Sequence, residues 1–475
     1  MTGPVLSVDQ GTSGTKALVV CPERGVIGAG FAEVRPRHLP GGLVEVDPEE
    51  LYASVVEAGR RALAEAREPV VALGLANQGE TVLAWNPATG RPLTTALVWQ
   101  DRRAESVCEE LAPHAEELRA LTGLPLDPYF AAPKMAWIRR HLTREGVVTT
   151  TDAWLVHRLT GAYVTDAATA SRTQLLDLDR TQWSPRALDL YGLAGERLPR
   201  IVGNAQPVGT TAEFGPEIPL TGLAVDQQAA LLAQRVTAPG GAKCTYGTGA
   251  FLLAHTGDTP RRGSSGLVSC VAWSLDGRTS YCLDGQVYTA ASAVQWLADL
   301  GVIKGAADLD VVGGSVSGTG GVTFVPALAG LAAPWWRGDL RGSLTGLGLD
   351  TTAGHLVRAL CEGIAAQVAE LVDALESPLE TLRVDGGLTR SALLMQTQAD
   401  LLQRPVEVSA LPDATALGAA ALARLGAEPG QKVTEVLPDR QPSVVHEPRI
   451  TADEAADRRA RFRAEVSALL DRTPA

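Results

Sequence analysis

One carboxylate in this chain stands where a hydroxyl group could be deprotonated. Asp226 ends an apolar segment in the stretch GLAVDQQAA and is followed by the amides Gln227 and Gln228. A carboxylate at the end of a strand can accept a proton from a hydroxyl group and help to orient it. Aspartate is also a common N-cap of the helix that this pattern predicts. The local sequence leaves both roles open, general base or helix cap.

A glycine-rich turn near the N-terminus could bind phosphate. In VDQGTSGTK, residues 8–16, glycines allow the turn to direct several backbone N–H groups inward, with hydroxyl and ammonium groups beside them. The candidate phosphate ligands are Gly11, Thr12, Ser13 and Lys16. Asp9, at the end of the preceding strand, could hold Mg²⁺ through water. The spacing fits neither a Walker loop nor GxGxxG, and an ordinary glycine-rich hairpin is the alternative.

Two later stretches have the same character. TYGTG, residues 245–249, is again a turn between two predicted strands, and VDGGLTRS, residues 384–391, combines a strand, a double-glycine turn and a helix. Turns from both halves of the chain could clamp a polyphosphate between them. The pair Gly386-Gly387 could let the backbone approach a flat ligand closely. Each stretch by itself is equally compatible with a simple tight turn.

Polar residues also interrupt an apolar region in LANQGETVLAWN, residues 75–86. Glu80 could accept hydrogen bonds from sugar hydroxyls, and Trp99 in VWQDRR could offer an apolar wall to a carbon chain. The alternative is a polar turn beside a core tryptophan. Gly79, in the middle of the polar group, leaves open space in either case.

The elements that must position these residues follow from the apolar periodicity. Alternating apolar residues predict three strands within 4–36, and the segment 47–66 has the pattern of an amphipathic helix with Asp47 as its N-cap. The segment 69–78 returns to strand, which gives the order β-β-β-α-β. The strand-turn-strand pattern recurs at 242–257 and predicts a second, related domain.

The rest of the chain fits the same α/β plan. We place the domains at residues 1–238 and 239–475, with the boundary inside RVTAPGGAK. The region 100–200 is predicted to be mostly helical, and two further helices are predicted near 287–300 and at 355–376. A chain of 475 residues is also longer than one core usually supports.

Composition excludes several functional classes. The formal net charge is −12, which argues against nucleic acid as a main partner. The chain contains six cysteines without CxxC or zinc-ligand spacing, which predicts reduced structural thiols. No secretory leader and no bilayer-spanning apolar segment is recognisable. We therefore predict a cytoplasmic protein without a membrane partner.

Together, the order and spacing of these motifs resemble the FGGY family of carbohydrate kinases, and within it the glycerol kinases. The resemblance extends over nearly the whole chain. The segments that carry it are VDQGTSGTKALV, NQGETVLAWNPATGRPLTTALVWQDRR, TGLPLDPYFAAPKMAWI, TDAWLVHRLTG, TDAATASRTQLLDL, GLAVDQQAALLAQ, TYGTGAFLL, AVQWL, GVTFVPALAGLAAPWW, VDGGLTRSALLMQTQADLL and TALGAAALA.

The resemblance implies two ribonuclease-H-like domains of the actin-type ATPase fold, with ATP and substrate in the cleft between them. It implies Mg²⁺-dependent transfer of the ATP γ-phosphoryl group to a hydroxyl of glycerol or a similar small polyol, with Asp226 as the general base and Asp9 near the metal. The implied substrate-binding residues are Gly79, Glu80, Trp99, Tyr129, Asp226, Gln227 and Phe251. The implied nucleotide-binding residues are Gly11, Thr12, Ser13, Lys16, Thr248, Ala291, Gln295, Gly387 and Ser391.

Three positions depart from the glycerol kinase pattern. Ala291 replaces a glycine and Ser391 replaces an asparagine, and both changes are small enough to keep ATP binding. Gly79 replaces an arginine that grips substrate hydroxyls in glycerol kinases. The space at Gly79 could admit a longer chain or a ring, or an arginine such as Arg102 or Arg103 could reach into it.

Two alternatives to a glycerol-like substrate follow. One is a kinase of the same family for a longer polyol or a ketopentose. The other is a non-catalytic ATPase of the actin superfamily, which the presence of Glu80, Trp99, Tyr129, Asp226 and Gln227 disfavours. A homodimer is an expectation at the level of the family alone.

Overall fold

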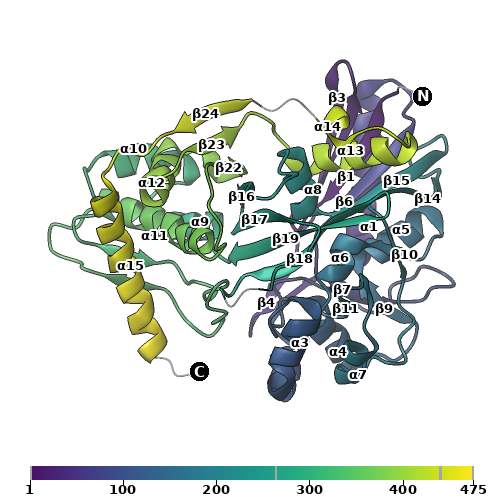
Figure 1. The fold of residues 1–475 in the computed structure, drawn as a ribbon, viewed down its shortest axis with the longest axis horizontal. Coiled ribbons are helices and arrows are strands. Elements are labelled where there is room, and N and C mark those ends of the chain that lie inside the picture. Colours follow the sequence, from purple (N-terminus) through teal and green to yellow (C-terminus); the bar gives the residue numbers. More distant parts are fainter. Residues whose placement is uncertain (1–2, 263–264, 438–440, 473–475) are drawn as a thin grey trace.

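The first half of the chain is organised around a six-stranded sheet. A computed structural model describes residues 3–262, 265–437 and 441–472 (Figure 1). Strands β1 (Val5–Gln10), β2 (Gly14–Cys21) and β3 (Gly25–Glu33) form an antiparallel meander, and β6 (Ala72–Asn77) pairs in parallel with β1. Strands β14 (Ala205–Thr211) and β15 (Ile218–Val225) complete the sheet in the order β14-β15-β6-β1-β2-β3.

Helix α1 (Pro48–Ala66) crosses from the meander to β6, so the predicted β-β-β-α-β order is confirmed. The helix begins as expected. An Asp47 carboxylate oxygen accepts the Glu49 N–H at 2.9 Å, and Pro48 occupies the first turn, where its missing N–H costs nothing. Apolar residues of α1 recur on one face and bury Leu51, Val55 and Ala58 against the sheet.

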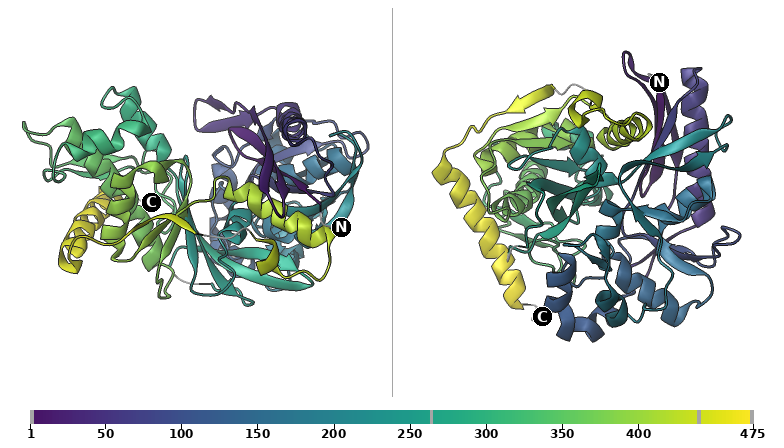
Figure 2. Two further views of the ribbon diagram at one scale, coloured as in Figure 1. Left: turned by 90° about the horizontal axis from the view of Figure 1, so that it is seen from above. Right: turned by 45° about the vertical axis from the view of Figure 1, so that its right-hand side comes forward.

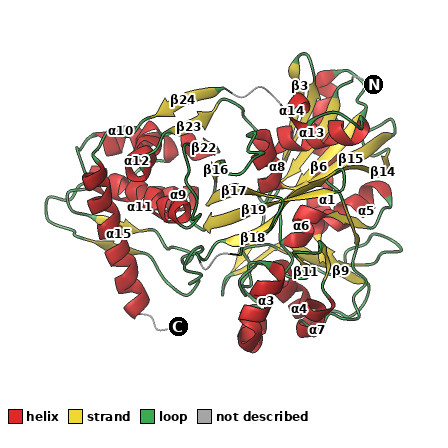
Figure 3. Cartoon of the chain, viewed as in Figure 1, coloured by secondary structure: helices red, strands yellow, loops and turns green. Residues whose placement is uncertain are grey.

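A second, smaller sheet adjoins the first and is flanked by helices (Figure 3). Its order is β4-β5-β8-β7-β9, formed by β4 (Arg37–Leu39), β5 (Leu43–Val46), β8 (Ala96–Leu97), β7 (Val82–Trp85) and β9 (Val147–Thr150). The helices of this region are α2 (Glu105–Leu111), α3 (Ala115–Thr122), α4 (Ala131–His141), α5 (Thr151–Thr160), α6 (Ala167–Ser171) and α7 (Pro185–Leu190). Short strands lie among them, namely β10 (Val164–Asp166), β11 (Leu176–Asp177), β12 (Gln182–Trp183) and β13 (Arg200–Val202).

The second half is built on a seven-stranded sheet in the order β18-β19-β17-β16-β22-β23-β24. Strands β16 (Ala242–Tyr246) and β17 (Ala250–Gly257) pair antiparallel across TYGTG, so the predicted second strand-turn-strand unit is confirmed. The other strands are β18 (Val268–Leu275), β19 (Arg278–Val287), β22 (Leu382–Asp385), β23 (Val406–Ser409) and β24 (Pro442–His446), with the separate pair β20 (Thr323–Val325) and β21 (Ser343–Thr345).

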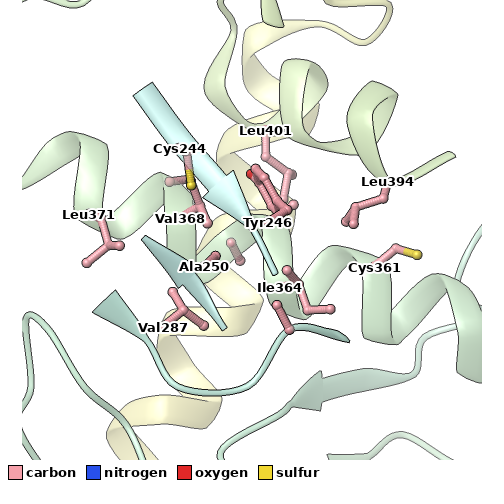
Figure 4. Close-up of a cluster of buried hydrophobic side chains, with 14 of the residues drawn as sticks. Cys244, Tyr246, Ala250, Val287, Cys361, Ile364, Val368, Leu371, Leu394 and Leu401 are labelled. Carbon is pink, nitrogen blue, oxygen red and sulfur yellow. The ribbon is translucent and has the colours of Figure 1, made fainter. Parts of the chain in front are cut away.

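Helices cover this sheet and close its core. They are α9 (Ala291–Asp299), α10 (Leu309–Gly314), α11 (Ala353–Asp373), α12 (Ala392–Leu402) and α15 (Ala452–Arg472). The short helix α14 (Val433–Val436) instead contacts α13 (Ala414–Ala427). Side chains of β16, α11 and α12 meet in the core, as Figure 4 shows for Tyr246, Ile364 and Leu394. A 3₁₀ segment of four residues, Gly387–Arg390, links β22 to α12, which fits the strand, double-glycine turn and helix predicted from the sequence.

One helix from the second half lies against the first sheet. Helix α13 (Ala414–Ala427) packs on β15, β6 and β1 and on α8 (Asp226–Ala233), and Figure 2 shows it beside the N-terminal strands. The Thr221 hydroxyl donates to the Ala423 carbonyl at 2.7 Å, and a Cβ at Gly418 would lie 1.9 Å from the Ala229 carbonyl oxygen. The chain thus joins the two halves a second time, beyond the single crossing at 234–242. The division at residue 238 stays a prediction.

The six cysteines are all free thiols, as predicted, and five of them are buried. In the described part of the chain, no helix combines the length and the apolar character that crossing a bilayer requires.

Candidate active site

Asp226 is the first residue of α8 and directly follows the buried strand β15. One carboxylate oxygen accepts the Gln227 N–H at 2.6 Å, and the side chain makes no further capping contact, since Val225 is the N-cap. Burial raises the pKa of Asp226, Lys243 and Arg172 oppose this effect, and Asp284 reinforces it. A partly exposed carboxylate with a raised pKa is a suitable acceptor for a hydroxyl proton.

The amide next to Asp226 is held by a buried lysine. The Lys243 ammonium donates to Gln227 Oε1 at 2.7 Å and to Thr245 Oγ1 at 2.8 Å. Lys243 is fully buried on β16, and burial lowers its pKa. The contact ties the start of α8, in the first half of the chain, to the strand that precedes the TYGTG turn.

Glu80 lies in a strained turn at the edge of the same space. Its φ of 59° is a left-handed conformation that costs a non-glycine residue free energy, and such strain is often found at binding sites. The side chain is buried and forms an ion pair with Arg172. Burial raises the pKa of Glu80 to about 7, against the opposing effect of Arg172. Asn77 and Gln78 have another role, because both side-chain amides donate to Gln10 Oε1.

Arg172 is the central cation of this space. Its guanidinium pairs with Glu80 and with Asp284 of β19, and Nη2 donates to the Tyr129 hydroxyl at 3.2 Å. The side chain is only 3% exposed. Because Asp284 belongs to the second sheet, this buried ion pair also joins the two halves of the chain.

Arg172, rather than Arg102 or Arg103, lies beside Gly79. An ideal Cβ at Gly79 would be 3.6 Å from Arg172 Nε and 3.1 Å from Val225 Cγ2. Arg102 instead pairs with Glu105, and Arg103 pairs with Asp101 and Glu45. Neither guanidinium lies beside Gly79, so the expectation that one of them fills this position is wrong. Arg102 does line a small pocket with Trp99 and Tyr129 on the other side of the aromatic rings.

Three aromatic rings form an apolar wall beside these polar groups. The Trp99 ring centroid lies 5.7 Å from that of Tyr129 and 6.1 Å from that of Phe251, both in edge-to-face contact. Trp99 also donates from Nε1 to Thr12 Oγ1 at 2.9 Å. One hydrogen bond therefore connects the wall to the glycine-rich turn at 11–14.

The glycine-rich turn lies between β1 and β2, where the sequence placed it. The Gly11 N–H donates to the Gly14 carbonyl at 3.0 Å, and Ser13 is exposed. The Lys16 ammonium pairs with Asp413, the residue before α13. Lys16 is 39% exposed and Asp413 is 25% exposed in their side chains, so solvent or a ligand can reach the pair.

Asp9 faces other carboxylates at the end of β1. Burial raises the pKa of Asp9 to about 8, the negative charges of Asp226 and Asp413 add to the effect, and Lys16 opposes it. A cation bound here would relieve this repulsion, so the donor set fits Mg²⁺. Among residues 3–262, 265–437 and 441–472, no group of three or more His, Cys, Asp or Glu side chains is arranged to hold a metal ion. Mg²⁺ bound with a nucleotide needs only one or two carboxylates, since phosphate oxygens and water supply the other ligands.

The raised pKa of Asp9 predicts how stability depends on pH. The native state binds a proton up to about pH 8, whereas the unfolded chain loses it near pH 4, so the free energy of unfolding falls as pH rises between these values. We expect Asp9→Asn to raise the melting temperature at pH 8 by at least about 2 °C and to leave it nearly unchanged at pH 4. Thermal unfolding of both proteins across this range, with the exposed Asp350→Asn as control, checks this. An equal shift at every pH would contradict it.

A large cavity opens beside this carboxylate group. Its volume is about 740 Å³, and it lies between β22, the 387–390 segment, β23 and the start of α13. Its lining includes Asp385, Gly387, Arg390 and Asp413. No atom lies within 4 Å of an ideal Cβ at Gly387, so the backbone faces open space there. The volume is sufficient for a nucleoside.

Other predicted nucleotide ligands gather at the TYGTG turn. The exposed Thr248 accepts the Ala290 N–H at 2.8 Å and the Ser292 N–H at 3.2 Å, and the Ala291 N–H donates to Gly247. The turn is thus fixed to the first residues of α9. Gln295 lies one turn further along α9, exposed, and its amide donates to Asp299 at 2.8 Å.

Ser391 lies deeper than the other candidate nucleotide ligands. Its hydroxyl donates to Asp310 at 2.6 Å and accepts the Leu394 N–H at 3.2 Å as the N-cap of α12. The side chain is therefore engaged within the protein, although its backbone follows the glycines that line the cavity.

Sequence reasoning missed the residues whose role depends on pairing between distant segments. Arg172 and Asp284 were not assigned, although each is a charged residue in an otherwise apolar or small stretch, TASRTQ and YCLDGQV. Asp413 was missed because only its position before α13 brings it to Lys16. A charge inside an apolar strand is a signal that could have identified Asp284.

Comparisons with known proteins agree with this geometry. The FGGY family of carbohydrate kinases matches with its N-terminal domain over residues 4–233 and with its C-terminal domain over residues 242–427. A glycerol kinase of Trichlorobacter lovleyi is 44% identical over 89% of this chain and 89% of its own length. A glycerol kinase of Bordetella parapertussis is 42% identical over 97% of this chain and 96% of its own.

Solved structures give the same result for the fold. The crystal structure of Plasmodium falciparum glycerol kinase with ADP matches with a TM-score of 0.89 and 30% identity, over 99% of this chain and 98% of that one. A kinase from Brucella ovis described as a xylulose kinase matches with a TM-score of 0.88 and 26% identity, over 98% and 99% of the two chains. The chain therefore belongs to the FGGY family of carbohydrate kinases.

Proposed function

We propose that this protein transfers the γ-phosphoryl group of ATP to a hydroxyl of glycerol or a similar small polyol, with Asp226 as the general base. One observation carries the proposal. Asp226, Glu80 and Asp9 lie at the same ends of the neighbouring parallel strands β15, β6 and β1, Glu80 pairs with Arg172, and the charge of Asp226 raises the pKa of both other carboxyl groups. A hydroxyl held by Glu80 and Arg172 is thereby placed beside both a proton acceptor and a phosphate-binding turn.

On the substrate side, each group has a defined task. The Glu80 carboxylate accepts hydrogen bonds from hydroxyls, the Arg172 guanidinium donates them, and Trp99 and Phe251 cover the carbon chain. Asp226 accepts the proton of the attacking hydroxyl. Exclusion of water by the aromatic wall strengthens these contacts and limits transfer of the phosphoryl group to water.

On the nucleotide side, backbone N–H groups and hydroxyls of the turn at 11–13 and of Thr248 bind the phosphates from the two halves of the chain. Lys16 exchanges Asp413 for a phosphate oxygen, a step made easy by its exposure. The cavity beside Gly387 holds the nucleoside. Mg²⁺, bound near Asp9 mainly through water and phosphate oxygens, would neutralise phosphate charge.

A second candidate is a kinase for a longer polyol or a ketopentose. It is favoured by Gly79, because the arginine of the glycerol kinase pattern is absent and a guanidinium reaches the space from α6 and the segment after it instead. A non-catalytic ATPase has no comparable support. A homodimer and a cytoplasmic location stay predictions.

The test is a coupled assay of ADP release with a panel of glycerol, tetritols, pentitols and ketopentoses. We expect ADP release that depends on a polyol or ketose and is far above the rate with ATP alone. Phosphorus NMR of the product then identifies the phosphorylated hydroxyl. ATP hydrolysis that no member of the panel stimulates would contradict the proposed function and favour an ATPase without a sugar substrate.

A further inference from the structure

Strand β19 presents a row of polar side chains toward the site. Asp284 and Gln286 are two residues apart, so both side chains point to the same face of the sheet. Their cross-strand partners on β17 are Leu253 and Phe251, and directly opposite residues share a face. Phe251 is the ring that contacts Trp99. This face of the second sheet is therefore one side of the substrate space.

Gln286 has no partner within the described chain. It is fully buried, yet neither its Oε1 nor its Nε2 makes a hydrogen bond to any described residue. Two groups near Arg172 have the same property, since Arg172 pairs with Asp284 and shares a contact to Cys270 Sγ with Gln228. Asp284 uses Oδ2 for Arg172 and leaves Oδ1 without a partner, and Gln228 Oε1 is buried without one. Buried polar atoms are almost always hydrogen-bonded, so such a group requires a specific explanation.

The surroundings of Gln286 indicate why its buried carboxamide has no hydrogen-bond partner. Asp284 on one side reaches Arg172, which contacts Glu80 and Tyr129. Tyr288 on the other side packs against Tyr129 with ring centroids 6.4 Å apart. Gln286 thus lies between two residues that both contact the polar and aromatic groups of the substrate space. Its carboxamide supplies two donors and an acceptor there.

We propose that Gln286 is a substrate-binding residue that determines specificity for a polyol or ketose of four or five carbons. This inference rests on the proposed kinase function and deepens it. Glu80, Arg172 and Asp226 suffice for the hydroxyls of a three-carbon polyol. Gln286 and Asp284 Oδ1 from the second half of the chain, and Gln228 Oε1 from α8 of the first half, add unpaired groups, and a longer hydroxylated chain satisfies them. A site built to hydrogen-bond a hydroxyl strongly disfavours an analogue that lacks it.

The decisive variant is Gln286→Leu, which keeps the side-chain size and removes the carboxamide. We expect wild-type kcat/KM to be highest for a tetritol, pentitol or ketopentose, and the variant to lose about 100-fold on that substrate but less than about 3-fold on glycerol. The preference is measured as the ratio of kcat/KM values in one preparation. An equal loss on every substrate, or a wild-type enzyme that prefers glycerol, overturns the inference.

A structural role for Gln286 is tested separately by thermal unfolding without substrate. Removal of an unpaired buried amide leaves the melting temperature unchanged or raises it, whereas loss of a structural hydrogen bond lowers it. Gln367→Leu is the matched control. Gln367 is also buried with an unpaired Nε2, but it belongs to α11, which packs on the opposite face of the sheet at Gly285. The control variant keeps the wild-type substrate ratio.

Failure of the proposed function has a different signature. If no polyol or ketose stimulates ADP release from the wild-type protein, the kinase proposal fails. Calorimetric titration with ribitol or xylulose needs no phosphoryl transfer and still decides the role of Gln286. Heat of binding that Gln286→Leu abolishes supports the inference, and its absence from the wild-type protein refutes it.

Discussion

Asp226→Asn lowers kcat by at least about 100-fold, the scale typical for loss of a general base. Asparagine preserves the size of the side chain and the acceptor for the Gln227 N–H at 2.6 Å, so α8 keeps its start. It cannot accept a proton from the attacking hydroxyl. Removal of the negative charge also lowers the pKa of Asp9, which Asp226 raises. We therefore expect nucleotide affinity to be retained or increased while turnover is lost.

Steady-state kinetics with the best substrate, together with calorimetric binding of Mg-ATP, checks this result. The control is Asp152→Asn, which removes another buried carboxylate of the same half of the chain. Asp152 accepts the Thr165 hydroxyl at 2.6 Å and has no contact with the site described above. Turnover near the wild-type value in Asp226→Asn would remove Asp226 from the mechanism.

Arg172→Met has the largest expected effect on stability. The substitution leaves the carboxylates of Glu80 and Asp284 buried without their shared counter-charge, which typically costs about 3–5 kcal/mol of unfolding free energy. It also removes the donor to Tyr129 and the guanidinium beside Gly79. Loss of activity should accompany the loss of stability, because substrate hydroxyls lose their cationic partner.

A second substitution tests whether the stranded carboxylates cause the loss of stability. Arg172→Met combined with Glu80→Gln removes one of the stranded charges, so we expect the double variant to be more stable than Arg172→Met alone, without regaining activity. Arg139→Met is the control, since Arg139 forms a less buried ion pair with Glu196. Urea denaturation of the four proteins measures the free energies. An Arg172→Met protein as stable as wild type would show that the ion pairs contribute little.

The part of the fold that depends on local periodicity was predictable. The meander, α1 with its Asp47 cap and the strand-turn-strand at 242–257 each follow from alternation, a capping residue or glycine placement within one short segment. The packing of helix α13 was not predictable, because the sequence of residues 414–427 does not indicate which sheet its face of small residues contacts. Its alanines and Gly418 allow close approach to Ala229, but only the assembled chain identifies that partner.

The site divides in the same way. Asp226, Glu80 and the turn at 11–14 can be identified from the sequence, because each places polar residues at the end of an apolar segment. Arg172 lies 92 residues from Glu80 and 112 from Asp284, and no pattern within either segment records that the three meet. The three residues pair because the two halves of the chain pack together. The apolar periodicity of a single sequence does not show how the halves pack.

The crowding at Gly79 has a consequence for how such a pocket can evolve or be redesigned. Side chains at positions 79, 172 and 225 compete for one volume, since an added Cβ at 79 already lies 3.1 Å from Val225 and 3.6 Å from Arg172. Substitutions at these positions are therefore epistatic. An arginine introduced at 79 requires Val225 to shift and must share the space with Arg172, so its effect depends on which residues occupy positions 172 and 225. Substrate preference here is encoded by a set of residues and cannot be read from any one of them.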